Sequence, residues 1–194
     1  GRVASYQRKQ LIVDKGFQVF LPHYKTARKL LDIKALDLCF YPKGASILSQ
    51  GQPQWFGHNY PDALQTGKKL TARWWDYVQL SMDIAHGFQR PSKTGKLCID
   101  HFKAQYSSKF STQFLEPFFR GVFLDPDCEK SVHEFQYYLH CFFRQGAAIP
   151  RLGMQEIPKQ MEKQLNPSQI ELNSTITKVD NNTLWIDNKA HQFK

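Results

Sequence analysis

Histidine and cysteine side chains are the most versatile metal ligands and catalytic groups, and this chain has seven histidines and four cysteines. Only His133 and His140 lie seven residues apart on one predicted helix, and no carboxylate completes a ligand set beside them. The cysteines are Cys39, Cys98, Cys128 and Cys141. None belongs to a Cys-x-x-Cys pair, so their spacing indicates neither a zinc site nor a disulfide framework. We expect no metal site, and thiols that are reduced and mostly buried, as in a cytoplasmic protein.

Two further residue pairs could take part in chemistry. Asp125 and Asp127 flank Pro126, an arrangement more typical of a turn than of a general acid–base pair. Trp74 and Trp75 could face a ligand, although adjacent aromatics on an amphipathic helix are more often core residues. The glycine-rich dinucleotide and phosphate loops and the Gly-x-Ser-x-Gly elbow do not occur in these residues. The residues alone therefore assign no catalytic group.

Composition and charge narrow the class of protein. The 194 residues are 41% hydrophobic and 14% aromatic, which is typical of a globular chain with a core. The net charge of +9 is spread in short pairs such as Arg8-Lys9, so we expect no nucleic-acid partner. No apolar run approaches the ~20 residues of a membrane span. There is no apolar signal segment and no initial methionine, so we expect a chain processed or excised from something longer, located in the cytoplasm either free or at a membrane surface.

The predicted helices and strands that would position a functional site are arranged around the stretch Phe114–Pro126. Its phenylalanines are too apolar for a solvated loop, and Pro117 and Gly121 interrupt one long helix, so it is predicted as a buried corner where helices meet. Ser131 and Glu134 have capping-box spacing and begin the next helix. One face of that helix is apolar. It comprises Val132, Phe135, Leu139, Phe142 and Phe143.

The rest of the chain alternates strands and helices. Strands are predicted at 2–8 and 11–20, around a turn at Arg8–Gln10, with a helix over 24–31. Residues 36–60 are irregular, with a short hairpin through Gln50–Gln52. The next helix is expected to bury Leu70, Trp74, Tyr77, Val78, Ser81, Ile84 and Ala85. Helices follow near Ile99 and Ser111 and from Gly153 to about Leu165. A meander at 169–172, 175–179, 183–186 and 191–193 ends the chain, with turns at Asp180 and Asp187. Strands from both ends could join in one sheet or dock on another domain.

Five segments, in order, resemble the flavin amine oxidase and phytoene desaturase superfamily. Gly1-Arg2-Val-Ala-Ser and the strand Val13–Phe20 are similar to the Gly-Gly-Arg and Asp-x-Gly-x-x-x-Phe segments of that superfamily. Phe114–Phe123 resembles its Pro-Phe-x-x-Gly-Val-Phe block. Ile149–Pro158 resembles its Pro-x-Gly-Gly-Met-x-x-Ile-Pro turn, and Ile170–Val179 resembles the strand that re-enters the FAD domain.

The predicted strands and helices indicate an α+β fold, and the resemblance implies an FAD-dependent oxidoreductase. Residues 22–150 would form a mostly helical substrate-binding cap, flanked by strands of an incomplete FAD-binding domain at 1–21 and 151–194. The flavin would take a hydride equivalent from an amine or apolar substrate. Amine, carotenoid or other isoprenoid, and porphyrinogen substrates all stay open, and the motifs are most similar to phytoene desaturases.

The resemblance also implies cofactor contacts. Gly1 and Arg2 would lie against the ribose and pyrophosphate, Gly153 and Met154 near the flavin ring, and Ile176 beside the adenine. Leu152 stands where the family has its first glycine. The family's Gly-x-Gly-x-x-Gly segment before residue 1 and Gly-Asp segment after residue 194 are expected on the missing FAD-domain segments of the same parent chain. We therefore expect this chain alone to bind FAD weakly or not at all and to be inactive. The alternative is a stand-alone, non-catalytic module that binds an apolar ligand or a polyanionic partner.

Overall fold

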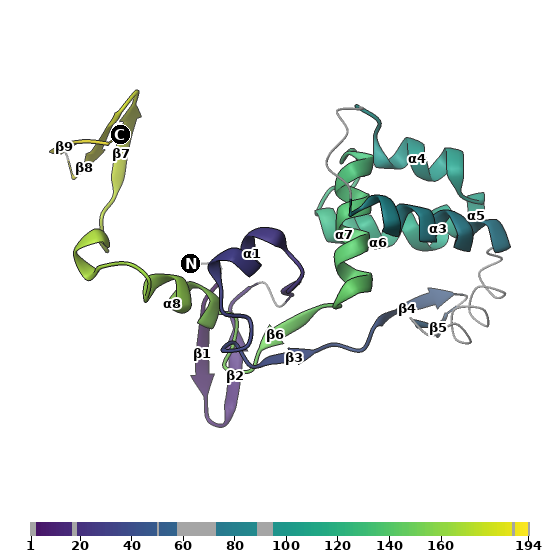
Figure 1. Cartoon of the computed structure of the whole chain (residues 1–194), viewed down its shortest axis with the longest axis horizontal. Helices are drawn as coiled ribbons and strands as arrows, with labels where there is room; N and C mark the ends of the chain where they lie inside the picture. The colour runs from purple at the N-terminus through teal and green to yellow at the C-terminus, as the bar shows by residue number, and fades with distance from the viewer. Residues whose placement is uncertain are drawn as a thin grey trace.

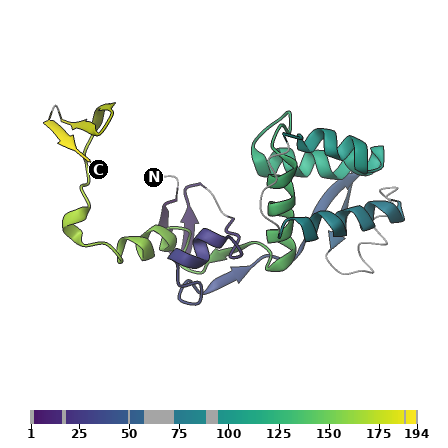
Figure 2. The same cartoon turned by 45° about the horizontal axis from the view of Figure 1, so that its top comes forward.

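A computed structural model describes residues 3–16, 19–49, 51–57, 73–88, 95–187 and 189–193. It shows three parts: a group of helices, a central part around two short sheets, and a separate C-terminal sheet (Figures 1 and 2). The helices are α1 (Lys25–Leu30), α3 (Trp74–His86), α4 (Cys98–Gln105), α5 (Ser108–Phe110), the π-helix η1 (Ser111–Leu115), α6 (Glu116–Phe123), α7 (Val132–Arg144), α8 (Glu156–Glu162) and the 3-10 helix η2 (Pro167–Gln169). The strands are β1 (Ser5–Arg8), β2 (Leu11–Asp14), β3 (Leu38–Phe40), β4 (Gly44–Ser49), β5 (Gln52–Gly57), β6 (Ala148–Pro150), β7 (Ile176–Asp180), β8 (Thr183–Ile186) and β9 (Lys189–Gln192). The α+β class is thereby confirmed.

The helical group, α3 to α7, surrounds an aromatic core. Phe102, Phe119 and Phe135 are almost wholly buried, and their ring centroids lie 4.7–6.0 Å apart. The predicted capping box at the start of α7 is confirmed. The Ser131 hydroxyl accepts from the backbone N–H of Glu134, whose carboxylate accepts from the N–H of Ser131.

The predicted corner at Phe114–Pro126 buries Leu115 and Phe119 but leaves Leu124 80% exposed, and it is not a break between helices. α5, η1 and α6 follow one another without interruption from Ser108 to Phe123. Pro117 is tolerated because it lies in the first turn of α6, directly after the widened π-turn in which the N–H of Glu116 donates to the carbonyl of Ser111. The chain turns only at Leu124, where φ is +52°.

The inward face of α3 was predicted only in part, since Ile84 packs against the core as expected. Trp74 is 73% exposed and Val78 is also exposed, while Asp76, Gln79 and Asp83 face the interior. Leu70 lies outside the described residues. The helical spacing of the apolar residues predicted that this side of the helix would face inward. Polar side chains are buried instead at several positions, because neighbouring helices supply hydrogen-bond partners for them.

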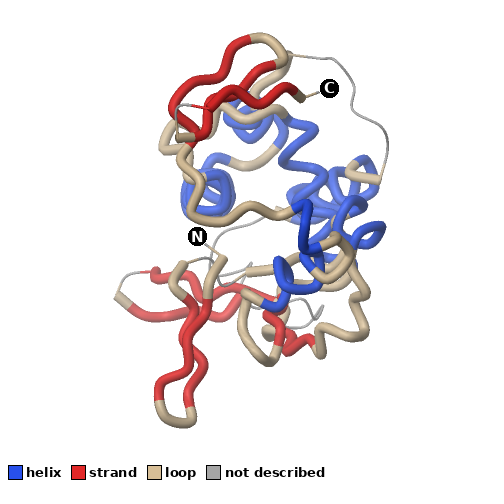
Figure 3. The backbone as a smooth tube through the Cα atoms, turned by 90° about the vertical axis from the view of Figure 1, so that its left-hand side faces the viewer, coloured by secondary structure: helices blue, strands red, loops and turns tan. Residues whose placement is uncertain are grey.

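The central part joins segments from both ends of the helical group. β1 and β2 form the predicted hairpin, although the strands are shorter than expected and β2 ends at Asp14. The turn end of the hairpin extends away from the rest of the molecule (Figure 3). β3 pairs antiparallel with β6, with Leu38 opposite Pro150, in a region predicted to be irregular. Phe20 adds a bridge to Ala148 through two 2.8 Å backbone hydrogen bonds.

The remaining strands form two sheets of their own. β4 and β5 make the predicted hairpin around Gly51. β7, β8 and β9 make the predicted antiparallel meander, with Asn181 in the left-handed conformation at its first turn. The strand predicted at 169–172 is wrong, because η2 ends at Gln169 and no strand follows before Ile176. In the described part of the chain the strands of the two ends do not join in one sheet.

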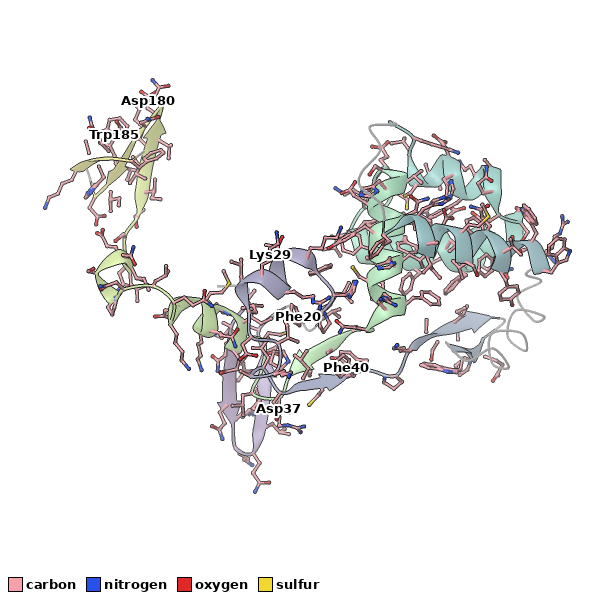
Figure 4. All side chains as sticks on the ribbon, viewed as in Figure 1. Phe20, Lys29, Asp37, Phe40, Asp180 and Trp185 are labelled. Atoms are coloured by element: carbon pink, nitrogen blue, oxygen red, sulfur yellow. The ribbon has the colours of Figure 1, made fainter. Side chains whose placement is uncertain are left out.

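Figure 4 locates representative side chains. Asp180 and Trp185 lie on the C-terminal sheet, whereas Phe20 and Phe40 lie in the central part. None of the helices among the described residues is long and apolar enough to cross a bilayer.

Candidate functional site

An apolar cavity of about 200 Å³ lies where the β3–β4 connection passes the ends of α6 and α7. Its lining is made almost entirely of aromatic, aliphatic and backbone atoms. The lining residues are Tyr41, Pro42, Lys43, Gly44, Ala45, Leu80, Phe114, Phe118, Phe119, Leu139, Phe142, Phe143, Gly146 and Ala147. Such a surface binds apolar groups by removing them from water.

Local sequence features place these walls. The ring of Phe118 lies 5.9 Å from that of Phe114 and 5.7 Å from that of Phe142, so one aromatic wall spans α6 and α7. The backbone N–H of Tyr41 donates to the carbonyl of Ala147 at 2.9 Å, which holds the opposite wall in place. Gly146 follows α7 with φ +79°, a conformation that glycine adopts without a steric penalty.

The cavity has an uneven charge distribution. None of its lining residues is an aspartate or glutamate, and Lys43 is the cation among them. The residues that the structure describes include no carboxylate in an ion pair with Lys43. The cavity therefore offers apolar contact and one positive charge, but its lining has no carboxylate or histidine to act as a general base.

The Gly153–Met154 turn packs against the β1–β2 hairpin. Gly153 has φ +90°, and a Cβ atom there would lie 2.5 Å from Oγ of Ser5 and 2.9 Å from Cγ2 of Ile12. The N–H of Met154 donates to a carboxylate oxygen of Asp14 at 2.9 Å, and the Ser5 hydroxyl donates to the same oxygen. The turn thus needs a glycine because of its conformation and because the hairpin fills the space beside it.

The residues predicted to contact the cofactor are only partly brought together. Gly1 and Arg2 lie outside the described residues. Gly153 and the buried Met154 share the turn, whereas Ile176 is 56% exposed on β7, away from that turn (Figures 1 and 2). Leu152, at the position of the family's first glycine, is exposed and does not have the positive φ of Gly153.

These positions do not form a flavin cradle by themselves. The space beside Gly153 is occupied by Ser5 and Ile12, so its missing side chain does not leave an opening for a ring. Ile176 could reach a cofactor at that turn only if the cofactor extended to the C-terminal sheet. The described residues therefore do not fit FAD as one continuous site.

A buried carboxylate network between α3, α4 and α7 was missed by sequence reasoning. Asp83 is fully buried and accepts from Tyr106 Oη at 2.6 Å, Gln136 Nε2 at 2.7 Å and Gln79 Nε2 at 3.3 Å, and it lies 2.8 Å from His101 Nε2. Burial alone would raise the pKa of Asp83, but the hydrogen bonds from His101, Tyr106 and Gln136 outweigh it and hold the pKa below its usual value. The network ties α3 to α4 and α7.

The period of the buried residues on α3 could have revealed this network. Asp76, Gln79 and Asp83 follow one another at intervals of three and four, which puts three polar side chains on one helical face. Asp76 accepts from both the hydroxyl and the N–H of Ser107, at 2.6 and 2.7 Å. Three polar side chains on one face of an otherwise amphipathic helix indicate hydrogen-bond partners inside the protein.

The histidines and cysteines form pairs rather than clusters. His140 faces His23 with a ring distance of 5.2 Å, and not His133. Groups of three or more potential metal ligands are absent from the described part of the chain. Three of the four cysteines are buried, as predicted, and the Sγ atoms of Cys98 and Cys128 are 3.0 Å apart. Burial raises the pKa of both thiols, which makes them poor nucleophiles.

Comparison with known proteins gives one positive finding. The family model for flavin containing amine oxidoreductases matches residues 1–192, almost the whole chain. A search of curated proteins finds no match.

Proposed function

Since this chain belongs to the flavin-containing amine oxidoreductase family, we propose that it supplies the substrate-binding part of a flavin-dependent oxidoreductase. The observation that carries the proposal is the apolar cavity beside α6 and α7, because the reactions of this family need a site that takes up a substrate away from water. We propose an amine or an apolar molecule as the substrate.

The position of the cavity supports this role. Ala147 lines it, and β6 begins at the next residue and leads directly to the Gly153–Met154 turn. Gly153 is six positions after Ala147, so the two points are at most ~22 Å apart. A molecule in the cavity could therefore extend toward the turn where the family resemblance expects the flavin.

We also propose that the chain alone binds FAD weakly or not at all. The support is the poor fit of the described residues to one cofactor cradle, together with the absence of a Gly-x-Gly-x-x-Gly motif from the 194 residues. Equilibrium dialysis against FAD measures this directly. Flavin absorbance that co-purifies with the chain in stoichiometric amount would contradict it.

Filling the cavity tests the substrate site. Ala147→Trp projects an indole into a space of about 200 Å³ and should weaken binding of a neutral solvatochromic dye such as Nile red about tenfold or more, a loss of at least ~1.4 kcal/mol. Ala85→Trp, on the exposed side of α3, is the matched control and should leave dye binding unchanged. Equal dye affinity in all three proteins would place the apolar site elsewhere.

Flavin reduction separates the enzyme from a binding module. The protein expressed from its complete reading frame is mixed anaerobically with candidate amines and isoprenoids, and loss of flavin absorbance is followed. Bleaching that Ala147→Trp abolishes supports the oxidoreductase. Ligand uptake without bleaching by any candidate favours the alternative, a non-catalytic module for an apolar ligand, which the same cavity would serve.

A further inference from the structure

Lys43 occupies an unusual position at the edge of the cavity. Its aliphatic stem lies over Gly146: a Cβ atom on that glycine would be 3.4 Å from both Cγ and Cε of Lys43. The residue lines the cavity and is itself exposed, so its carbon atoms extend the apolar wall while its ammonium group reaches water.

The charge of Lys43 has no protein counterpart in the described part of the chain. No lining residue is a carboxylate, and no described carboxylate forms an ion pair with it. An apolar surface that ends in one unpaired cation matches an apolar molecule that ends in one anionic group.

A structural reason for Lys43 must be weighed against this. Gly146 follows α7 closely, and the C-terminal end of a helix attracts cations. However, α7 already has Arg144 in its last turn. The helix end explains a favourable position for Lys43, and this role predicts an effect on stability without an effect on ligand choice.

The aromatic wall by itself would favour the binding of amines. The faces of Phe114, Phe118 and Phe142 could attract a ligand cation. A ligand ammonium group at the same edge would meet the like charge of Lys43 with no carboxylate to offset it. The charge of Lys43 therefore disfavours amines among the substrate classes that the family resemblance leaves open.

We propose that the cavity selects an amphiphile with an apolar body and an anionic head of the carboxylate type, and discriminates against alkylammonium ions. This inference rests on the proposed function, in which the cavity is the substrate site. The cavity volume of about 200 Å³ is below the ~300–1,000 Å³ of typical small-molecule sites, so it would enclose one end of the ligand and leave the head at Lys43.

Three ligands of one chain length test the selection near neutral pH: dodecanoate, methyl dodecanoate and dodecylammonium. Each competes with Nile red for the chain, below the concentration at which it aggregates. Dodecanoate should bind about fivefold more tightly than the ester, the upper range for one exposed ion pair, and dodecylammonium more weakly than the ester. Lys43→Met should abolish the preference for dodecanoate over the ester, and Lys43→Glu should reverse the order of dodecanoate and dodecylammonium. Lys103→Glu, an exposed change of the same charge on α4, should leave the order of the native protein intact.

The outcomes separate this inference from the proposed function. Equal binding of acid and ester by the native protein overturns the charge selection but keeps the apolar site. Failure of all three ligands and of the dye to bind overturns the proposed substrate site itself. A Lys43→Met protein that loses thermal stability and keeps the native order of affinities shows that Lys43 serves the end of α7 alone, and also overturns the inference.

Discussion

The helical group and the C-terminal sheet bury their side chains very differently. Within α4 to α7, Phe102, Phe110, Phe119 and Phe135 are at most 1% exposed. Every residue of β7 is exposed, and every residue of β8 is only half-buried. The first region has a core made from its own residues, whereas a small sheet without a covered face gains little from folding. Local hydrogen bonding forms both regions, but only the helical group gains stability from packing.

The largest expected effect follows from removing one core ring. Phe119→Ala should lower the free energy of unfolding by about 3–5 kcal/mol, because it leaves a cavity among Phe102, Phe123 and Phe135. Urea denaturation followed by far-ultraviolet circular dichroism measures the change. A loss below ~1 kcal/mol would mean that this core is not well packed, and the contrast with the sheet would then fail.

The next effect concerns the polar half of the same region. Asp83→Ala should cost about 3 kcal/mol near neutral pH, because His101, Tyr106 and Gln136 lose a buried acceptor. Urea titration at neutral pH gives the value. Asp187→Ala, in an exposed turn of the C-terminal sheet, serves as the control and should change stability much less.

The lowered pKa of Asp83 adds a pH dependence with a defined sign. The folded protein holds this carboxylate ionised at a pH where the unfolded chain, with a pKa near ~3.9, is protonated. Its contribution is therefore complete above about pH 4 and is lost as the pH falls through the lower, folded-state pKa. Urea midpoints measured across this acid range should fall more steeply for the native protein than for Asp83→Asn. Parallel curves would contradict the depressed pKa.

A smaller effect is expected where the central part is held together. Gly153→Ala should destabilise the packing of the turn on the hairpin by about 1–3 kcal/mol, since φ is +90° and the new atom meets Ser5. Hydrogen exchange should accelerate in β1 and β2 and not in α7. Gly121→Ala is the matched control within α6: nothing lies within 4 Å of its Cβ position, so stability should rise by up to ~1 kcal/mol.

The smallest effect belongs to the C-terminal sheet. Val179→Ala, at 63% exposure on β7, should change the free energy of unfolding by less than ~0.5 kcal/mol. The same urea titration compares it with Phe119→Ala. If the two substitutions cost similar amounts, the sheet has a packed face after all, and the comparison between the two regions is broken.

Short-range rules predicted much of the fold correctly. The three-residue spacing of Ser131 and Glu134 predicted the start of α7, and Asn181 predicted the turn between β7 and β8. The glycine and proline residues of this segment also predicted the β4–β5 hairpin around Gly51. Each of these features depends on groups only a few residues apart, so the residues themselves carry the information.

Features that needed distant partners were missed or reversed. β3 and β6 pair across the whole helical group, and Arg151 Nε lies 2.6 Å from a carboxylate oxygen of Asp37, 114 residues away. At Gly153, Ser5 and Ile12 of the distant β1–β2 hairpin take the space that a side chain would need. No local pattern identifies which distant side chain will fill such a space.

Short-range patterns in the residues were enough to predict the α+β class, the caps and turns, and the family of the chain. The inward face of α3 and the position of the cavity became known only from the packing of the folded chain. Helical spacing alone predicted that Trp74 and Val78 would be buried, yet both are exposed. Asp83 is buried instead, because His101, Tyr106 and Gln136 form hydrogen bonds with its carboxylate oxygens. The burial of a polar group depends on partners supplied by other helices, and those partners meet only once the chain has folded.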